Sequence, residues 1–179
     1  MNTDAIKLRA WEYSDVPLLA KYANNKNVSI NLTDSFPFPY TEEDGKRFVS
    51  RIREKEDIPV FLIEYNGEFA GGIGLHQKND IYRICYVLGY WVIEPLWGKG
   101  IVTEAIRQIV IKGFERPDLE RIEAGTFEWN KASARVLEKN GFILESIIKK
   151  GAIKDGKIID LYNYRMLRDE ALDLGLIKK

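Results

Sequence analysis

The sequence predicts a domain of the α+β class, and three observations support this. The turn sequences Asn66-Gly67 and Asp155-Gly156 each stand between apolar runs, which is the strongest short-range signal for a β-hairpin. Apolar residues in 101–114 recur at helical spacing, whereas other stretches alternate as strands do. No repeat or linker interrupts the 179 residues, a length typical of one domain. We therefore expect a single domain over 1–179, with its core at about 5–168 and a short C-terminal tail.

The N-terminal third predicts one strand and two helices. Residues 5–11 alternate between apolar and charged, and Ser14 offers an N-cap to a helix over about 14–24. A long, proline-rich connection at 24–40 follows, and loops of this length inside a domain are often functional. Thr41 is suited to cap a second helix that runs to about Lys55, because three acids in its first turn favour the positive end of the helix dipole.

The rest of the chain predicts further strands, two more helices and a final hairpin. Asn130 is an N-cap candidate for a helix over about 131–140, which Gly141 closes in a left-handed conformation. The charged tail 168–179 predicts a short helix or a frayed end. Strands are expected at 60–64, 69–75, 82–93, 121–127, 144–153 and 157–167.

Composition excludes several classes of protein. Lys plus Arg and Asp plus Glu are both 27, so the net charge is zero and the positive field of a nucleic-acid binder is absent. One Cys allows no internal disulfide, and one Cys with one His predicts no metal site. Cys85 is expected to be a small buried hydrophobe, with a reactive nucleophile as the alternative. No apolar run spans a bilayer and no secretory signal is present, so we expect a cytoplasmic protein without membrane or nucleic-acid partners.

The stretch most informative about function joins a strand to the helix at 101–114. Its glycines, Gly98 and Gly100, let the backbone approach a ligand, and the first helical turn has free N–H groups. These features suit a phosphate or pyrophosphate, and the alternative is a turn with no ligand. A P-loop pattern is absent, and the dinucleotide fingerprint fails because Thr103 stands where a third glycine is needed.

This stretch resembles the acetyl-CoA pyrophosphate loop of the GNAT superfamily of N-acetyltransferases, and more closely that of the RimJ/RimL-like branch. Motifs of that branch are found from about Ile6 to Leu167. They are Pro39-Tyr40-Thr41, Gly89-Tyr90-Trp91, Trp97-Gly98-Lys99-Gly100-Ile101, Thr103-Glu104-Ala105, 130–133 with 137–142, and Asp160-Leu161-Tyr162. The resemblance implies a GNAT-like fold, with a twisted, mixed but mostly antiparallel sheet of about seven strands flanked by about four helices.

The resemblance also implies the reaction and the residues that bind the co-substrate. The acetyl group of acetyl-CoA would move to a primary amine by direct attack in a ternary complex, without a metal, in a monomer or homodimer. The amine would belong to a protein N-terminus, a polyamine or a small molecule. Backbone groups around Val92 and Ile93 would hold the pantetheine arm, and Asn130 would reach its amide besides capping a helix. The residues of the pyrophosphate loop would be Trp97, Gly98, Lys99, Gly100, Ile101, Val102 and Thr103.

Two departures from the family pattern leave the catalytic groups open. Pro95, which lacks an N–H, stands at the first position of the loop pattern, and Leu137 stands where many members carry a tyrosine as general acid. Ser133 and Tyr162 are therefore candidate donors to the leaving thiolate, and Glu94 is a candidate base. Each has a plainer alternative: a solvated first-turn serine, a half-buried strand tyrosine and an exposed strand-end carboxylate.

The acceptor is expected on the side opposite acetyl-CoA, between the 24–40 loop and the hairpin turn at 154–157. Phe36 and Phe38 are the candidate substrate contacts, and the alternative is that both only pack. The acids at 42–44 are expected to cap their helix. Trp97 is expected to anchor its loop, and His76 to stay apart from substrate. A non-catalytic acyl-CoA-binding sensor or interaction module is the alternative function.

Overall fold

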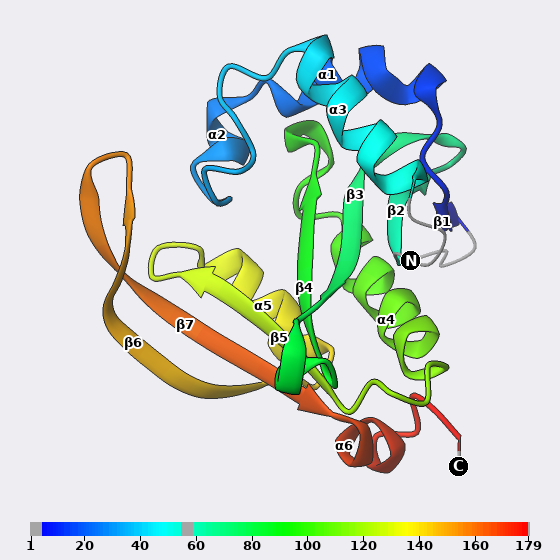
Figure 1. The fold of residues 1–179 in the computed structure, drawn as a ribbon, viewed down its shortest axis with the longest axis vertical. Coiled ribbons are helices and arrows are strands. Elements are labelled where there is room, and N and C mark those ends of the chain that lie inside the picture. The colour runs from blue at the N-terminus through cyan, green and yellow to red at the C-terminus, as the bar shows by residue number, and fades with distance from the viewer. Residues whose placement is uncertain (1–4, 55–58, 179) are drawn as a thin grey trace.

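The computed structural model describes residues 5–54 and 59–178, whose strands form one mixed sheet (Figure 1). The strand order is β1-β2-β3-β4-β5-β7-β6. Neighbouring strands are antiparallel except β4 and β5, which run parallel. The strands are β1 (Ile6–Arg9), β2 (Val60–Tyr65), β3 (Glu68–Gln77), β4 (Cys85–Val92), β5 (Arg121–Phe127), β6 (Ile143–Lys154) and β7 (Lys157–Leu167).

Six α-helices and three 3-10 turns connect these strands in the described part of the chain. The four longer helices expected from the sequence are present, the tail forms the short helix α6 that was one of its two expected states, and only the short helix α2 was not expected. The helices are α1 (Val16–Ala23), α2 (Lys26–Ser29), α3 (Glu42–Arg53), α4 (Ile101–Phe114), α5 (Lys131–Lys139) and α6 (Arg168–Asp173). The 3-10 turns are η2 (Tyr13–Asp15), η3 (Asp80–Tyr82) and η4 (Glu94–Leu96).

The helices divide between the two faces of the sheet. Side chains of α1 and α3 join Leu62 in one apolar cluster, whereas α4 and α5 join Ile63 in another. Because neighbouring residues of a strand point to opposite faces, α1 and α3 cover one face and α4 and α5 the other. In Figure 1 the β6–β7 hairpin curves away from the sheet and its tip rises on the side of α2.

Several local signals in the sequence are confirmed. Asn66 and Gly67 have φ of 54° and 80°, and Asp155 and Gly156 have φ of 47° and 74°, as tight hairpin turns require. Thr41 caps α3 in a capping box with Asp44. The side chain of Asn130 caps α5, accepting the backbone N–H of Ser133 at 3.1 Å. Gly141 follows α5 with φ of 84°.

The expected strand at 82–93 begins only at Cys85. Its first residue, Tyr82, ends the 3-10 turn η3, where Asp80 takes a left-handed φ of 59° and Ile81 and Tyr82 are 68% and 59% exposed. Aromatic and β-branched residues favour strands, but these have no partner strand or core to pack against. Cys85 itself is half-buried rather than buried.

The helix expected from Ser14 begins two residues later than predicted. Ser14 lies inside the 3-10 turn η2 and does not cap α1, which starts at Val16. Asp15 organises this turn instead, because it accepts the N–H of Glu12 at 2.8 Å and two bonds from the guanidinium of Arg9 at 2.7 and 2.8 Å.

Other bounds differ by a few residues. The first strand is shorter than the expected 5–11, and the expected end of the second helix, Lys55, lies outside the described residues, as does Lys179 of the tail. Glu104 of α4 is buried, and Arg107 and Gln108 of the next turn bind its carboxylate. Within the described residues, no helix is both long and apolar enough to span a membrane.

Candidate active site

The parallel pair β4 and β5 opens partway along its length. Paired residues end at Val87 and Glu123, yet β4 continues to Val92 and β5 to Phe127. In the antiparallel ladder with β3, Ile93 donates its N–H to Ala70 and Lys78 donates to the carbonyl of Cys85, both at 2.9 Å. Backbone polar groups alternate in direction along a strand, so those of Leu88, Tyr90 and Val92 face the opening instead. The opening is therefore lined on the β4 side by backbone donors and acceptors, and we refer to it as the β4–β5 opening.

Val92 and Ile93, the expected pantetheine contacts, differ in what they offer. Both backbone groups of Ile93 are engaged, since its N–H bonds to Ala70 and its carbonyl accepts the N–H of Leu96 at 3.0 Å. Ile93 therefore has no free backbone N–H to offer a ligand, and its carbonyl already accepts one hydrogen bond. The carbonyl of Val92 accepts the indole N–H of Trp97 at 2.9 Å, which leaves the Val92 N–H directed into the opening. Trp97 anchors the following loop through this bond, although its side chain is 46% exposed.

The loop after β4 combines two left-handed glycines with a helix N-terminus. Gly98 and Gly100 have φ of 74° and 73°, and Gly100 is the N-cap residue of α4 without a side chain to fill that role. No hydrogen bond of the described chain occupies the N–H groups of 101–103. Gly98, Lys99 and Gly100 are exposed, Val102 and Thr103 are half-buried, and Ile101 is buried. This is a concave set of free donors suited to an anion.

Helix α5 places Ser133 beside Tyr90 of β4. The Ser133 hydroxyl lies 2.6 Å from the hydroxyl of Tyr90, a bond in which either oxygen can donate. Burial raises the pKa of Tyr90 to about 12, so its phenol stays protonated at neutral pH. Leu137, expected from the resemblance to stand at the position of the usual tyrosine, is fully buried in the core between α5 and the sheet. A serine and a tyrosine hydroxyl thus occur together near the opening.

Tyr90 was not singled out as a functional residue by the sequence. Its phenol joins Ser133 only because β4 and α5, about forty positions apart in the chain, meet beside the opening. The one local signal was its place in the Gly-Tyr-Trp motif, where strand alternation puts Tyr90 on the face opposite Trp91.

Glu94, the candidate base, is held by α2 and the residue before it. Its two carboxylate oxygens accept the side-chain amides of Asn25 at 2.7 Å and Asn27 at 2.8 Å. These asparagines were not predicted, since no local signal indicated that part of the expected loop forms a short helix. Both donors are neutral amides, so neither brings a positive charge to the carboxylate.

Within the described residues, no recorded hydrogen bond or ring contact joins Tyr162 or His76 to the Tyr90–Ser133 pair. Tyr162 stands opposite Thr126 in the sheet and packs on the core, with the ammonium of Lys131 4.8 Å from its ring centre. This matches the alternative of a half-buried strand tyrosine. His76 is exposed on β3, on the sheet face that α1 and α3 cover in part.

The two candidate acceptor residues have different surroundings. Phe36 is half-buried, with its ring 5.6 Å from that of Trp91 and 5.0 Å from that of Tyr40. Phe38 is 46% exposed, and its nearest recorded partner is the ammonium of Lys26 at 5.4 Å. Phe36 therefore belongs to the wall beside β4, whereas Phe38 lies at the surface.

The 24–40 loop contacts the C-terminal hairpin, and these are the two segments between which the acceptor was expected. Lys154, buried at the end of β6, binds Asp34 at 2.7 Å, and Lys26 binds Asp155 at 2.5 Å. Trp129, between β5 and α5, also donates its indole N–H to Asn31 at 3.1 Å. These contacts hold the loop against the hairpin and against the segment between β5 and α5.

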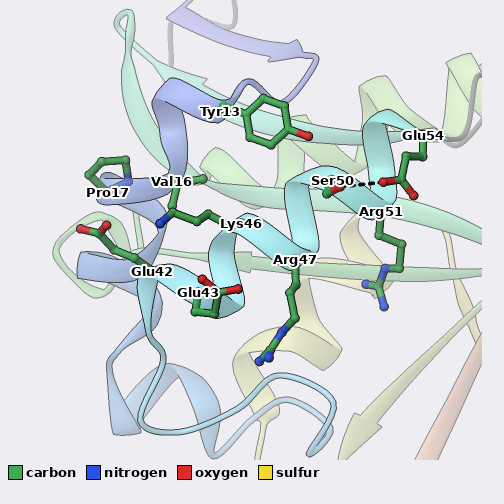
Figure 2. A pocket seen from close by; sticks show the side chains of 10 residues that line it. All are labelled: Tyr13, Val16, Pro17, Glu42, Glu43, Lys46, Arg47, Ser50, Arg51 and Glu54. Carbon is green, nitrogen blue, oxygen red and sulfur yellow. Dashed lines mark hydrogen bonds between the residues drawn. The ribbon is translucent and has the colours of Figure 1, made fainter.

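A separate hollow of about 630 Å³ lies between α1 and α3. Figure 2 shows charged side chains of both signs along α3, with Arg47 and Arg51 extending away from Tyr13 and Pro17. None of the predicted site residues lines it, and it lies apart from the β4–β5 opening. Within the described residues, no cluster of acids, histidines or cysteines is suited to hold a metal.

Comparison with known proteins identifies the family. A family model described as "Acetyltransferase (GNAT) domain" matches residues 5–143. The chain belongs to the GNAT acetyltransferases. As in that family, it is an N-acetyltransferase that uses acetyl-CoA. The expectation drawn from the loop and the flanking motifs is thereby confirmed.

Individual relatives agree with this assignment. YnaD of Bacillus subtilis, named an uncharacterized N-acetyltransferase, is 30% identical over 173 residues, covering 95% of this chain and 98% of its own. YdaF of the same organism, named a putative ribosomal N-acetyltransferase, is 33% identical over 106 residues, which are 59% of this chain but only 57% of YdaF. The solved structure of RimL, a ribosomal L7/L12 alpha-N-protein acetyltransferase in complex with coenzyme A, has a TM-score of 0.80 over 93% of this chain and 96% of its own. At 24% identity that match shows the fold.

Proposed function

We propose that the protein transfers the acetyl group of acetyl-CoA to a primary amine by direct attack, at the β4–β5 opening. The observation that carries the proposal is the continuity of the opening with the glycine loop and the N-terminus of α4. A thioester in the opening and a pyrophosphate on the loop would belong to one extended molecule. No activated nucleophile for a covalent intermediate stands beside the opening among the described residues, which favours a ternary complex.

The pyrophosphate would rest on the loop from Gly98 to Thr103. Left-handed glycines and the first turn of α4 supply backbone N–H groups without internal acceptors, and the helix dipole adds a positive potential. Lys99 is exposed in the same loop and adds a positive charge. Pro95 contributes no N–H, so binding rests on the residues that follow it.

The pantetheine arm and the thioester would lie in the opening. The N–H of Val92 faces it, and a backbone donor aimed at a developing oxyanion contributes roughly 3–4 kcal/mol to acyl transfer. Asn130 uses its side-chain oxygen to cap α5, and its amide nitrogen has no recorded acceptor in the described chain. That nitrogen is suited to donate to an amide carbonyl of the arm.

Ser133 would assist the departing thiolate. Its hydroxyl can accept a hydrogen bond from the protonated phenol of Tyr90 while donating its own proton toward sulfur. Tyr162 remains the second candidate, although its ring packs on the core. Ser133 is favoured because a 2.6 Å bond fixes its position.

Glu94 would receive the proton that the amine loses, directly or through water. The two asparagine amides fix both of its oxygens, and no cation within the described residues is recorded against them. An unneutralised carboxylate attracts an ammonium group and is able to take its proton. Phe36 and Phe38 would supply the apolar neighbour of that amine.

A screen with acetyl-CoA tests the proposal. The purified protein is incubated with acetyl-CoA and a panel of peptides, polyamines and small amines, while free thiol release and product masses are measured. The proposal predicts thiol release that depends on an amine and an equal amount of acetylated amine. A protein that melts at a higher temperature with acetyl-CoA but releases no thiol with any amine would be the non-catalytic module instead.

A further inference from the structure

Glycines gather on the sheet face that α1 and α3 cover in part. Gly72 and Gly74 of β3 lie on this face, and internal packing explains both. A side-chain carbon at Gly72 would lie 3.0 Å from the side chains of Trp11 and Trp91, and one at Gly74 would lie 2.7 Å from Val60. These two residues are glycine because larger side chains occupy the space.

Gly89 and Gly125 on the same face have no such reason to be glycine. A carbon added at Gly89 would meet only His76 Nε2 at 4.0 Å, and one at Gly125 only Asn163 Oδ1 at 3.8 Å. Neither has a left-handed φ, and both are exposed. A glycine inside a strand lowers stability relative to alanine, so each costs stability without relieving any internal contact.

The two residues occupy equivalent places on either side of the β4–β5 opening. The last paired residues are Val87 and Glu123, and Gly89 and Gly125 each stand two positions beyond. Alternation along a strand puts them on the same face as that last pair. Gly89 is paired with Gly74, and the nearest side chain to Gly74, that of Val60, belongs to the cluster of α1 and α3. Both glycines therefore border the opening on the face away from α4 and α5.

We propose that Gly89 and Gly125 determine acceptor specificity by keeping this border free of side chains. The inference rests on the proposed function, because it assumes that the amine reaches a thioester in the opening. Bare backbone on both sides leaves room for substituents on the carbon that bears the amine. The predicted acceptors are primary amines whose amine-bearing carbon is branched, and amines on an unbranched carbon are accepted too.

Two alanine variants measured with two amines test this. The amines are glycinamide, whose amine-bearing carbon is unbranched, and alaninamide, which adds one methyl group. The wild type is expected to acetylate both with similar kcat/KM. In Gly89→Ala and in Gly125→Ala, kcat/KM for alaninamide should fall about tenfold more than that for glycinamide, because an added methyl meets the branch. The KM for acetyl-CoA should stay unchanged, and the melting temperature should hold or rise.

Ser146→Thr is the matched control. Ser146 stands on β6 opposite Asn163, so the variant adds one carbon to the same face, two strands from the border. It should leave the ratio of the two amines unchanged. Equal losses for both amines in the glycine variants, or no losses, would overturn the inference. So would a wild type that binds acetyl-CoA but rejects alaninamide. Failure of the wild type to bind acetyl-CoA would instead refute the proposed function.

Discussion

The pair of hydroxyls at Tyr90 and Ser133 allows a sharp test of how the leaving group is protonated. Tyr90→Phe keeps the ring and removes only the phenol, which lies 2.6 Å from the Ser133 hydroxyl. Loss of one such buried bond should lower the free energy of unfolding by about 1 kcal/mol. For a chain of this size that corresponds to a melting temperature lower by about 2–4 °C. Ser133 keeps its hydroxyl but loses the partner that orients it.

The kinetic effects should be unequal and non-additive. Ser133→Ala removes the donor, so kcat should fall by about 10²–10⁴-fold, the usual contribution of a general acid. Tyr90→Phe should cost about tenfold in kcat, and neither variant should change the KM for acetyl-CoA.

In the double variant, kcat should equal that of Ser133→Ala alone, because Tyr90 acts only through Ser133. Steady-state thiol release at saturating amine measures all four proteins. Two outcomes would refute the reasoning: a wild-type kcat in Ser133→Ala, or losses that multiply in the double variant.

Three further predictions concern the acceptor side and the stability of the fold. Phe38→Ala should raise the KM for the amine without changing the melting temperature. Phe36→Ala should raise the same KM and, because it also removes the ring contact with Trp91, should lower the free energy of unfolding by about 2 kcal/mol. If the variants raised the KM for acetyl-CoA as much as the KM for the amine, the loop would not belong to the acceptor site. Arg9→Ala leaves the buried carboxylate of Asp15 without its cationic partner. The free energy of unfolding at pH 7, measured by chemical denaturation, should fall by about 2–3 kcal/mol. Burial alone would raise the pKa of Asp15, but its bonds to Arg9 and to a backbone N–H outweigh burial and lower the pKa. The loss of stability in Arg9→Ala should therefore shrink as pH falls below the ordinary aspartate range. A loss of stability that does not depend on pH would contradict this. Burial, with a lesser effect of a glutamate, raises the pKa of Tyr164 to about 12. The wild type should therefore lose stability as pH rises above 10, and this group should account for about 1.4 kcal/mol of the loss at pH 11. Tyr164→Phe should not show that part of the loss.

Features with a local cause could be predicted from the sequence. The Asn66-Gly67 and Asp155-Gly156 turns and the caps at Thr41 and Asn130 depend on residues within a few positions of one another, and all four are present. The glycine loop before α4 was recognisable for the same reason. Where the signal was local but misleading, as at Tyr82, a residue suited to strands lay where no strand was available to pair with it.

Features that depend on distant partners were not predictable. The bond of Tyr90 to Ser133 joins β4 to α5, and the bonds of Asn25 and Asn27 to Glu94 join α2 to the end of β4. Ile93 was expected to offer backbone groups, but the β3–β4 register and the turn after it use both. Register and helix packing decide which atoms are free, and one sequence alone carries little information about either.

Calorimetric titration with acetyl-CoA is the sharpest test of whether the loop from Gly98 to Thr103 holds the pyrophosphate. Gly100→Asp places a side chain and a negative charge at the N-terminus of α4, where Gly100 has φ of 73°. Gly67→Asp is the matched control, because Gly67 has φ of 80° in the β2–β3 turn with open space around it. We predict that Gly100→Asp weakens acetyl-CoA binding by tenfold or more, roughly 1.4 kcal/mol, while Gly67→Asp binds as the wild type does. Unchanged affinity in Gly100→Asp would contradict the account.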